Sequence, residues 1–295
     1  MSIINSNTLF HFTSNITSIK GIIKNGVRLS YCYEECTQNF GFAIPMICFC
    51  DIPLLRTLEH RRKYGSYMVG FDKDYLIKSN LLFLNPVHYL NSSFLINIGD
   101  DFFKTQLDLI NNSFYNELKL YMEDKGYTKL LEKYSVEDLL NTNEDLKYKE
   151  EQISMAVNKF RYSLVFSKLY ASKTGGKEII NYDEREWRYI SNLYSEDNDF
   201  LSWIPQISKD EFNSRRKDLN SKLWSNPKSY MRIDANEICK AVKFIVVKTE
   251  RQIPSMIKFI RTSKKIFGVD NLSSEHKDLL TQVSDLEFKP FEHTL

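Results

Sequence analysis

The scarcity of glycine is the feature that most constrains what this chain can fold into. Its 295 residues include 10 glycines and 7 prolines, about half the share that is usual in globular proteins. The motifs GxxxxGK[ST] and GxGxxG, whose glycines let a backbone approach phosphate groups, occur nowhere in the sequence. A P-loop NTPase and an ordinary Rossmann dehydrogenase are therefore excluded, and any nucleotide site must be built from side chains.

The charge balance limits the partners that this chain can bind by charge alone. Lysine and arginine number 40 and aspartate and glutamate 38, which leaves a net charge of +2. Attachment to nucleic acid or membrane mainly through bulk charge is therefore not expected. The first residues lack the pattern of a signal peptide, and the longest nearly apolar run, residues 40–50, is about half a membrane span. We expect a soluble, cytoplasmic protein without a membrane partner.

The cysteines indicate reduced thiols. Five cysteines are an odd number, which fits free thiols better than a disulfide framework. The spacings Cys32-x3-Cys36 and Cys48-x-Cys50 differ from the CxxC pairs of structural zinc sites. Cys48 and Cys50 would share one face of a buried strand, where thiols are common. We expect no metal.

Hydrophobic periodicity predicts a single α+β domain over residues 1–295, with a helical insertion at 100–172. The first helix has Ser14 or Asn15 as its cap and Asn25-Gly26 as its stop. Strands are expected at 8–13, 44–49, 67–71, 185–190 and 241–247, with a short extended piece at 27–30. Helices are expected at 14–24, 53–64, 74–79 and 253–267, and within the insertion at 102–121, 130–140 and 147–170.

The first candidate motif is the stretch LFHFT at residues 9–13. In a strand His11 and Thr13 point to one side, while Phe10 and Phe12 point to the other. Two polar groups would then share a face that two aromatic rings anchor from behind. The alternative is an edge strand whose histidine is satisfied by hydrogen bonds within the fold.

The second motif is YDEREWRY at residues 182–189. The period of a strand places Glu184, Glu186 and Arg188 on one face. Two carboxylates at this spacing repel each other, which predicts a raised pKa for one of them and marks a candidate working site. The alternative is a solvated strand face with a Glu–Arg pair.

Together these motifs resemble a known family. The order HFT, a helix that ends in NG, CFCDIPL, His60, YGSYMVGFDKDYL and EREWRYI resembles the AbiGi-type abortive-infection proteins of bacterial phage-defence modules. The resemblance covers residues 9–90 and 183–190. It implies an anti-phage protein, the antitoxin half of a two-gene system, with a cognate toxin or another defence-module protein as its partner.

More distantly, the same order is similar to the ADP-ribosyltransferase fold, including the DarT-type toxins that modify DNA. This resemblance implies an ADP-ribosyltransferase-like split sheet core with NAD⁺ as a substrate and no metal. It assigns His11 to the first catalytic position, Glu186 or Glu184 to the last, and Tyr64 or Tyr67 to the aromatic position between them. The implied NAD⁺-binding residues are His11, Thr13, Ser30, Tyr64, Tyr67 and Arg188.

The chemistry agrees with that assignment, because cleaving the nicotinamide–ribose bond builds positive charge that a carboxylate stabilises. An aromatic ring would favour the cationic nicotinamide.

Two hypotheses about function follow. An enzyme would transfer ADP-ribose to a protein or nucleic acid, or hydrolyse NAD⁺. A non-catalytic antitoxin or sensor would use the same scaffold to bind a partner toxin, a nucleic acid or a phage component.

Overall fold

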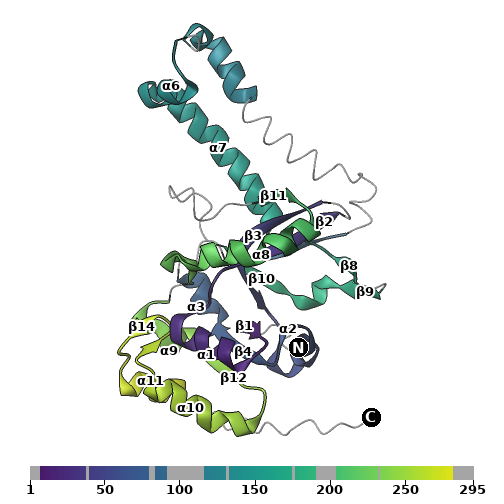
Figure 1. Ribbon diagram of the computed structural model, residues 1–295, viewed down its shortest axis with the longest axis vertical. Helices are drawn as coiled ribbons and strands as arrows, with labels where there is room; N and C mark the ends of the chain where they lie inside the picture. Colours follow the sequence, from purple (N-terminus) through teal and green to yellow (C-terminus); the bar gives the residue numbers. More distant parts are fainter. Residues whose placement is uncertain are drawn as a thin grey trace.

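A central sheet and a projecting arm of helices make up the chain in the computed structural model (Figure 1). Among the described residues, no helix is both long and apolar enough to cross a membrane. The structure describes residues 7–37, 40–79, 84–91, 116–130, 133–174, 177–190, 204–231 and 233–281.

The sheet is organised around β3, the longest of its strands. β2 and β11 pair with the first part of β3, while β10 and β1 pair toward its end. Every one of these pairings is antiparallel. The main strand order is β12 (Val242–Val246), β4 (Tyr67–Asp72), β1 (Thr8–Thr13), β3 (Phe40–Cys50), β10 (Glu186–Ile190) and β5 (Leu84–Pro86), with β2 (Ser30–Thr37) and β11 (Ile204–Ile207) off this path.

The two faces of the sheet are covered by different elements. On the first face, Leu9, Phe49 and Val69 belong to the largest core. This core also contains apolar side chains of α1 (Ile16–Asn25), α8 (Lys209–Trp224) and α10 (Ile253–Thr262). On the second face, a smaller core forms from Phe42, Ile44, Met46 and Ile190 with Leu164, Val165 and Phe166. The alternation of side chains along each strand therefore decides which core a residue joins.

The arm has a small core of its own. It consists of helix 116–124, α6 (Val136–Thr142) and α7 (Glu144–Val165), and it extends away from the sheet at the top of Figure 1. A capping box between Ser135 and Asp138 begins α6. The buried residues of the arm are Leu118, Met122, Leu139, Leu146 and Ile153.

The remaining elements surround the sheet. β6 and β7 form a short parallel pair, while β8 and β9 form an antiparallel one. The bounds are η1 (Leu54–Arg56), α2 (Leu58–Tyr64), α3 (Lys73–Lys78), β6 (His88–Leu90), β7 (Ser167–Leu169), β8 (Ala171–Thr174), β9 (Lys177–Ile180), η3 (Asn181–Glu184), α9 (Ile238–Ala241), β13 (Lys265–Ile266), β14 (Val269–Asp270) and α11 (Ser274–Leu280).

Strong local signals in the sequence predicted their elements correctly. The strands at β1, β4, β10 and β12 and the helix at α1 are confirmed. Asn15 caps α1, because its side-chain oxygen accepts the Ser18 N–H at 2.8 Å. Gly26 ends α1 with a φ of +93°, a left-handed conformation that glycine adopts without strain.

Other predictions were wrong in extent. Ser30, where the extended piece at 27–30 was expected to end, is instead the first residue of β2, and β3 begins at Phe40 rather than Ile44. The helix expected at 53–64 is divided at Thr57 into η1 and α2. α7 ends at Val165 instead of continuing to residue 170, because the next residues form β7 and pair with β6. Most of the helix expected at 102–121 lies outside the described residues.

We predict that substitutions of two glycines have opposite effects on stability. Gly65 has a φ of +115°, and a Cβ there would overlap the backbone of Thr13. Gly65→Ala should therefore lower the free energy of unfolding by about 3 kcal/mol. Gly21 lies inside α1 with open space around it, so Gly21→Ala should raise it by about 0.5–1 kcal/mol. Urea denaturation of both variants checks this, and equal midpoints would contradict it.

Candidate functional site

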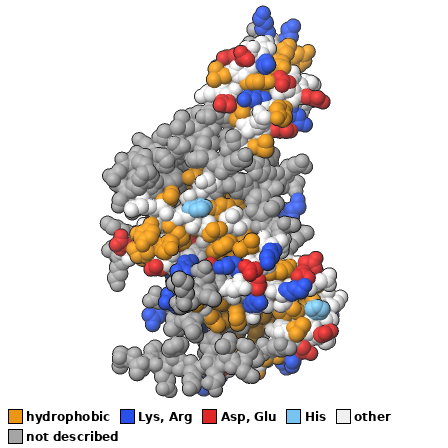
Figure 2. Space-filling model, turned by 180° about the vertical axis from the view of Figure 1, so that it is seen from behind, with side chains coloured by type: hydrophobic (Ala, Val, Ile, Leu, Met, Phe, Trp, Pro, Cys, Tyr) orange, Lys and Arg blue, Asp and Glu red, His pale blue; other side chains and the backbone are white. Residues whose placement is uncertain are grey.

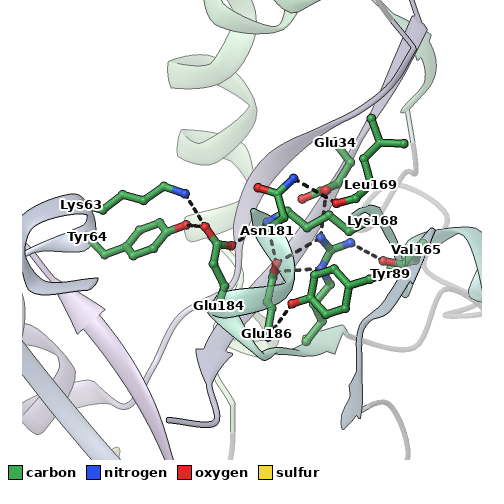
Figure 3. A network of polar contacts seen from close by, with 11 residues as sticks. Glu34, Lys63, Tyr64, Tyr89, Val165, Lys168, Leu169, Asn181, Glu184 and Glu186 are labelled. Carbon is green, nitrogen blue, oxygen red and sulfur yellow. Dashed lines mark hydrogen bonds and ion pairs between the residues drawn. The ribbon is translucent and has the colours of Figure 1, made fainter. Parts of the chain in front are cut away.

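A network of charged side chains lies where β10 meets β3, β7 and the end of α7 (Figure 3). Three carboxylates and three cations form it. Glu34 comes from β2, Lys63 from α2, Lys168 from β7, Glu184 from η3, and both Glu186 and Arg188 from β10. We call these six residues the charge network.

Glu184 lies in η3, outside the strand whose period grouped it with Glu186 and Arg188. Arg185 adopts a left-handed φ of +42° and separates η3 from β10. The alternation of β10 therefore begins at Glu186, and its side chains at 186, 188 and 190 are buried while 187 and 189 are partly exposed. The turn nevertheless keeps Glu184 beside Glu186, because Lys168 Nζ lies 2.9 Å from a carboxylate oxygen of each.

Arg188 is the most completely buried member of the network, with 0% of its side chain exposed. Its Nε lies 2.9 Å from Glu186 Oε1, and its Nη2 lies 2.9 Å from Glu34 Oε2. Its Nη1 donates to the carbonyl oxygen of Val165, the last residue of α7. The guanidinium thus satisfies a carbonyl that the helix end leaves unpaired. One side chain joins α7, β2 and β10.

Glu184 has its own set of partners. Lys63 Nζ and the Tyr64 hydroxyl both donate to Oε1, while Lys168 Nζ binds Oε2. The Tyr89 hydroxyl accepts a hydrogen bond from the Glu186 backbone N–H at 2.8 Å. All carboxylate oxygens of Glu184 and Glu186 are bound by groups of the chain itself.

The expected raised pKa of one of the paired carboxylates is wrong. Burial opposes ionisation of Glu186, but the charges of Arg188 and Lys168 outweigh it and hold the pKa well below its ordinary value. The pKa of Glu184 is lowered for the same reason, by Lys168 and by hydrogen bonds from Lys63 and Tyr64. Glu34 has the raised pKa, and burial is its main cause.

His11, Thr13 and Tyr67 lie on the opposite face of the sheet. Cys50 pairs with both Phe10 and Glu186, so Phe10 and Glu186 share the second face and His11 projects from the first. Thr13 pairs with Tyr67 on the first face. The structure therefore does not bring His11 beside Glu186, and their joint role at one NAD⁺ molecule stays a prediction.

His11 has structural partners on its own face. Its Nδ1–H donates to the Cys48 carbonyl at 2.9 Å, and its ring meets the Phe49 ring edge-on at 5.9 Å. Burial lowers the pKa of His11, which keeps the ring neutral. These contacts match the alternative of a satisfied histidine in a strand. The Tyr67 hydroxyl, on the same face, accepts from Gln252 Nε2 at 3.0 Å.

The remaining predicted residues, Tyr64 and Ser30, both lie on the second face. Tyr64 joins the second face, where it contacts Glu184 and the Phe12 ring at 6.4 Å. Ser30 opens β2 and pairs with Met46. The structure therefore gathers one group of predicted residues on the second face and another on the first, and the roles assigned to them at NAD⁺ stay predictions. The first group is Glu184, Glu186, Arg188 and Tyr64, and the second is His11, Thr13 and Tyr67.

The thiols beside the network stay protonated. A hydrogen bond with Cys32, burial and the charge of Glu186 raise the pKa of Cys48. Burial is the main cause of the raised pKa of Cys50. Neither is therefore an activated nucleophile. Within the described part of the chain, no group of three or more histidine, cysteine, aspartate or glutamate side chains could hold a metal ion.

Sequence reasoning missed Glu34, Lys63, Lys168 and Tyr89. Lys63 lies in the helix predicted at 53–64, and Lys168 lies at the end of the helix predicted at 147–170. Their partner Glu184 lies 121 residues from Lys63 and 16 from Lys168. The alternation in SYCYEECT at residues 30–37 was the one available local signal, since it puts Glu34 on the same face as Cys32.

Most of the chain matches a known protein family. Residues 31–240 match a family of abortive phage resistance proteins. The chain belongs to this family, which is described as "abortive phage resistance protein AbiGi, antitoxin". The resemblance drawn from the sequence is thereby confirmed. The matched range includes the whole charge network and the arm, but it begins after His11 and Thr13.

A curated relative supports the same family. The abortive phage resistance protein AbiGi of Lactococcus lactis subsp. cremoris is 27% identical over 182 residues, which are 57% of this chain. The match spans 59% of the relative's length. No solved structure matches the chain, so the likeness to the ADP-ribosyltransferase fold stays a prediction.

Loss of Arg188 should destabilise the protein strongly. In Arg188→Met, Glu34 and Glu186 stay buried without their shared cation, and such a loss costs about 3–5 kcal/mol. The matched control is Arg215→Met, which removes an exposed pair with Glu211 worth about 0.3–0.5 kcal/mol. Urea denaturation of both variants measures the difference. A cost below about 1 kcal/mol for Arg188→Met would contradict the role of the network.

Acid should reduce the cost of losing Arg188. The pKa values of Glu184 and Glu186 lie below the ordinary 4.5 in the folded chain. Their stabilising contribution is therefore complete above pH 4.5 and is lost as the pH falls toward the folded values. The raised pKa of Glu34 acts in the opposite direction, because protonation relieves a burial cost.

We therefore expect the difference in unfolding free energy between the wild type and Arg188→Met to shrink as the pH falls from about 7 to about 3.5. Urea denaturation at several pH values measures it. A difference that stays constant over this range would show that ionisation of the carboxylates does not contribute.

Proposed function

We propose that this chain is the antitoxin of a two-component phage-defence module and that it acts by binding a protein partner. One observation carries the proposal: both carboxylate oxygens of Glu186 are already bound by cations of the chain. Arg188 holds Oε1 and Lys168 holds Oε2, and Glu186 is only 5% exposed. A carboxylate that is held in this way favours a structural role over a role in binding a ligand.

The alternative function, an NAD⁺-dependent transferase, would require His11 and Glu186 to be arranged differently. One NAD⁺ molecule would have to contact His11 and Glu186 together, although the sheet register directs them to opposite faces. The carboxylate of Glu186 would also have to leave Arg188 and Lys168, at the cost of unpairing buried charges. We therefore retain this activity only as an outcome of the test.

The family match supports a binding role. The description of the family names an antitoxin, and the matched residues include the arm and the network that fastens it to the sheet. The Arg188 guanidinium binds the last carbonyl of α7, so the network fixes the base of the arm. A fixed helical arm offers a preorganised surface, which lowers the entropic cost of binding a partner.

The test pairs this chain with the product of the adjacent defence gene in a bacterial host. We expect the neighbouring product alone to inhibit growth, and co-expression of this chain to restore growth and to yield a complex that copurifies. Cellular NAD⁺ should stay unchanged. His11→Asn, which retains a donor toward the Cys48 carbonyl, should protect as well as the wild type, because His11 lies on the face away from the network.

Two results would overturn the proposal. Consumption of NAD⁺ that requires both His11 and Glu186 would support the transferase. Protection without any protein complex, accompanied by retention of nucleic acid or a phage component on the purified chain, would support a sensor. Circular dichroism and the urea midpoint of each variant check that it is folded.

A further inference from the structure

α7 has two faces with different surroundings. Leu146 and Ile153 lie seven residues apart and are buried in the core of the arm. On the opposite side, at spacings of four, three and four residues, lie four exposed side chains that together form what we call the acidic stripe. At about 100° per residue they fall on one narrow side of the helix. They are Glu144, Tyr148, Glu151 and Met155.

Two members of the stripe are large side chains of apolar character that are exposed. Tyr148 is 61% exposed and Met155 is 53% exposed, and both lie in the first half of a 22-residue helix. Figure 2 shows hydrophobic side chains among charged ones on the surface of the arm. Exposed apolar groups that repeat along one helix side and are rimmed by charge mark an interaction surface.

The charge of the arm specifies the kind of partner. The arm, residues 116–165, contains ten acidic and eight basic residues, and the first half of α7, residues 144–155, contains four acidic and two basic ones, although the whole chain has a net charge of +2. Lys149, which neighbours the stripe in sequence, is directed away from it, with its Nζ 5.6 Å from the centre of the Tyr121 ring. Lys147, which is exposed three residues after Glu144 and four before Glu151, borders the stripe, so the two glutamates leave this side of α7 with one excess negative charge.

We infer that the acidic stripe is the surface that binds the protein partner, an inference that rests on the proposed antitoxin function. The partner is a protein whose docking helix or groove carries lysine or arginine beside apolar side chains. Tyrosine and methionine supply contact area that adapts to a partner. The two glutamates select a basic face and exclude an acidic one.

The position of the stripe suits this role. The C-terminal end of α7 is held at the sheet by Arg188, which binds Val165. The stripe lies toward the N-terminal end of α7, away from the sheet (Figure 1). A partner can thus contact the stripe along one helix, as amphipathic helices do in helix-to-groove recognition.

The test measures the dissociation constant of the complex with the adjacent defence gene's product, for two double variants of the full chain. These are Glu144→Lys with Glu151→Lys, and Tyr148→Ala with Met155→Ala. Matched controls on helix 116–124 are Glu117→Lys and Leu120→Ala, where Leu120 is 62% exposed. We expect about tenfold or greater weakening for each double variant and less than about twofold for the controls.

Added salt should weaken the wild-type complex more than the Glu144→Lys, Glu151→Lys complex, because screening acts on the charged contacts. Circular dichroism and urea midpoints equal to wild type confirm that the variants fold.

Wild-type affinity in both double variants would overturn the inference and leave the proposed function intact, since the partner would then bind elsewhere. Sedimentation that shows the chain pairing with itself through the stripe, while the complex is unaffected, would also overturn it. Failure of the wild type to form any complex is a separate result, and it would refute the proposed function first.

Discussion

The burial of Arg188 is the constraint on which the rest of this structure depends. A guanidinium removed from water needs partners for its charge and for its donors. Glu186 on the same strand, Glu34 on β2 and the Val165 carbonyl at the end of α7 provide them. Because these partners come from three elements, satisfying one side chain fixes how sheet, strand β2 and arm meet.

The register of the sheet determines what the site can do. A strand sends neighbouring side chains to opposite faces, so pairing Phe10 and Glu186 with Cys50 is enough to separate His11 from Glu186. The second face holds balanced charges that are fully engaged with one another. The first face holds a neutral histidine in a largely apolar core. Among the described residues, the carboxylates of Glu184 and Glu186 are held by cations, and His11 donates to a backbone carbonyl.

α7 is fixed at one end and exposed on one side along its first half. The charge network anchors α7, and α7 presents exposed side chains at a distance from the sheet. The residues that match the AbiGi family include both the charge network and α7. The energy stored in buried ion pairs is not a large gain in stability, but it specifies one orientation of the arm.

The sequence by itself determined the features that depend on neighbouring residues. These were the family, the strands at β1, β4 and β10, and the Asn15 cap and Gly26 stop of α1. Alternation also identified Glu186 and Arg188 as one group. Only the tertiary structure decided that Lys168 and Glu34 complete this group and that His11 lies outside it. The physical reason is range: caps and alternation act within a few residues, whereas strand register and buried ion pairs join residues that only the folded chain brings together.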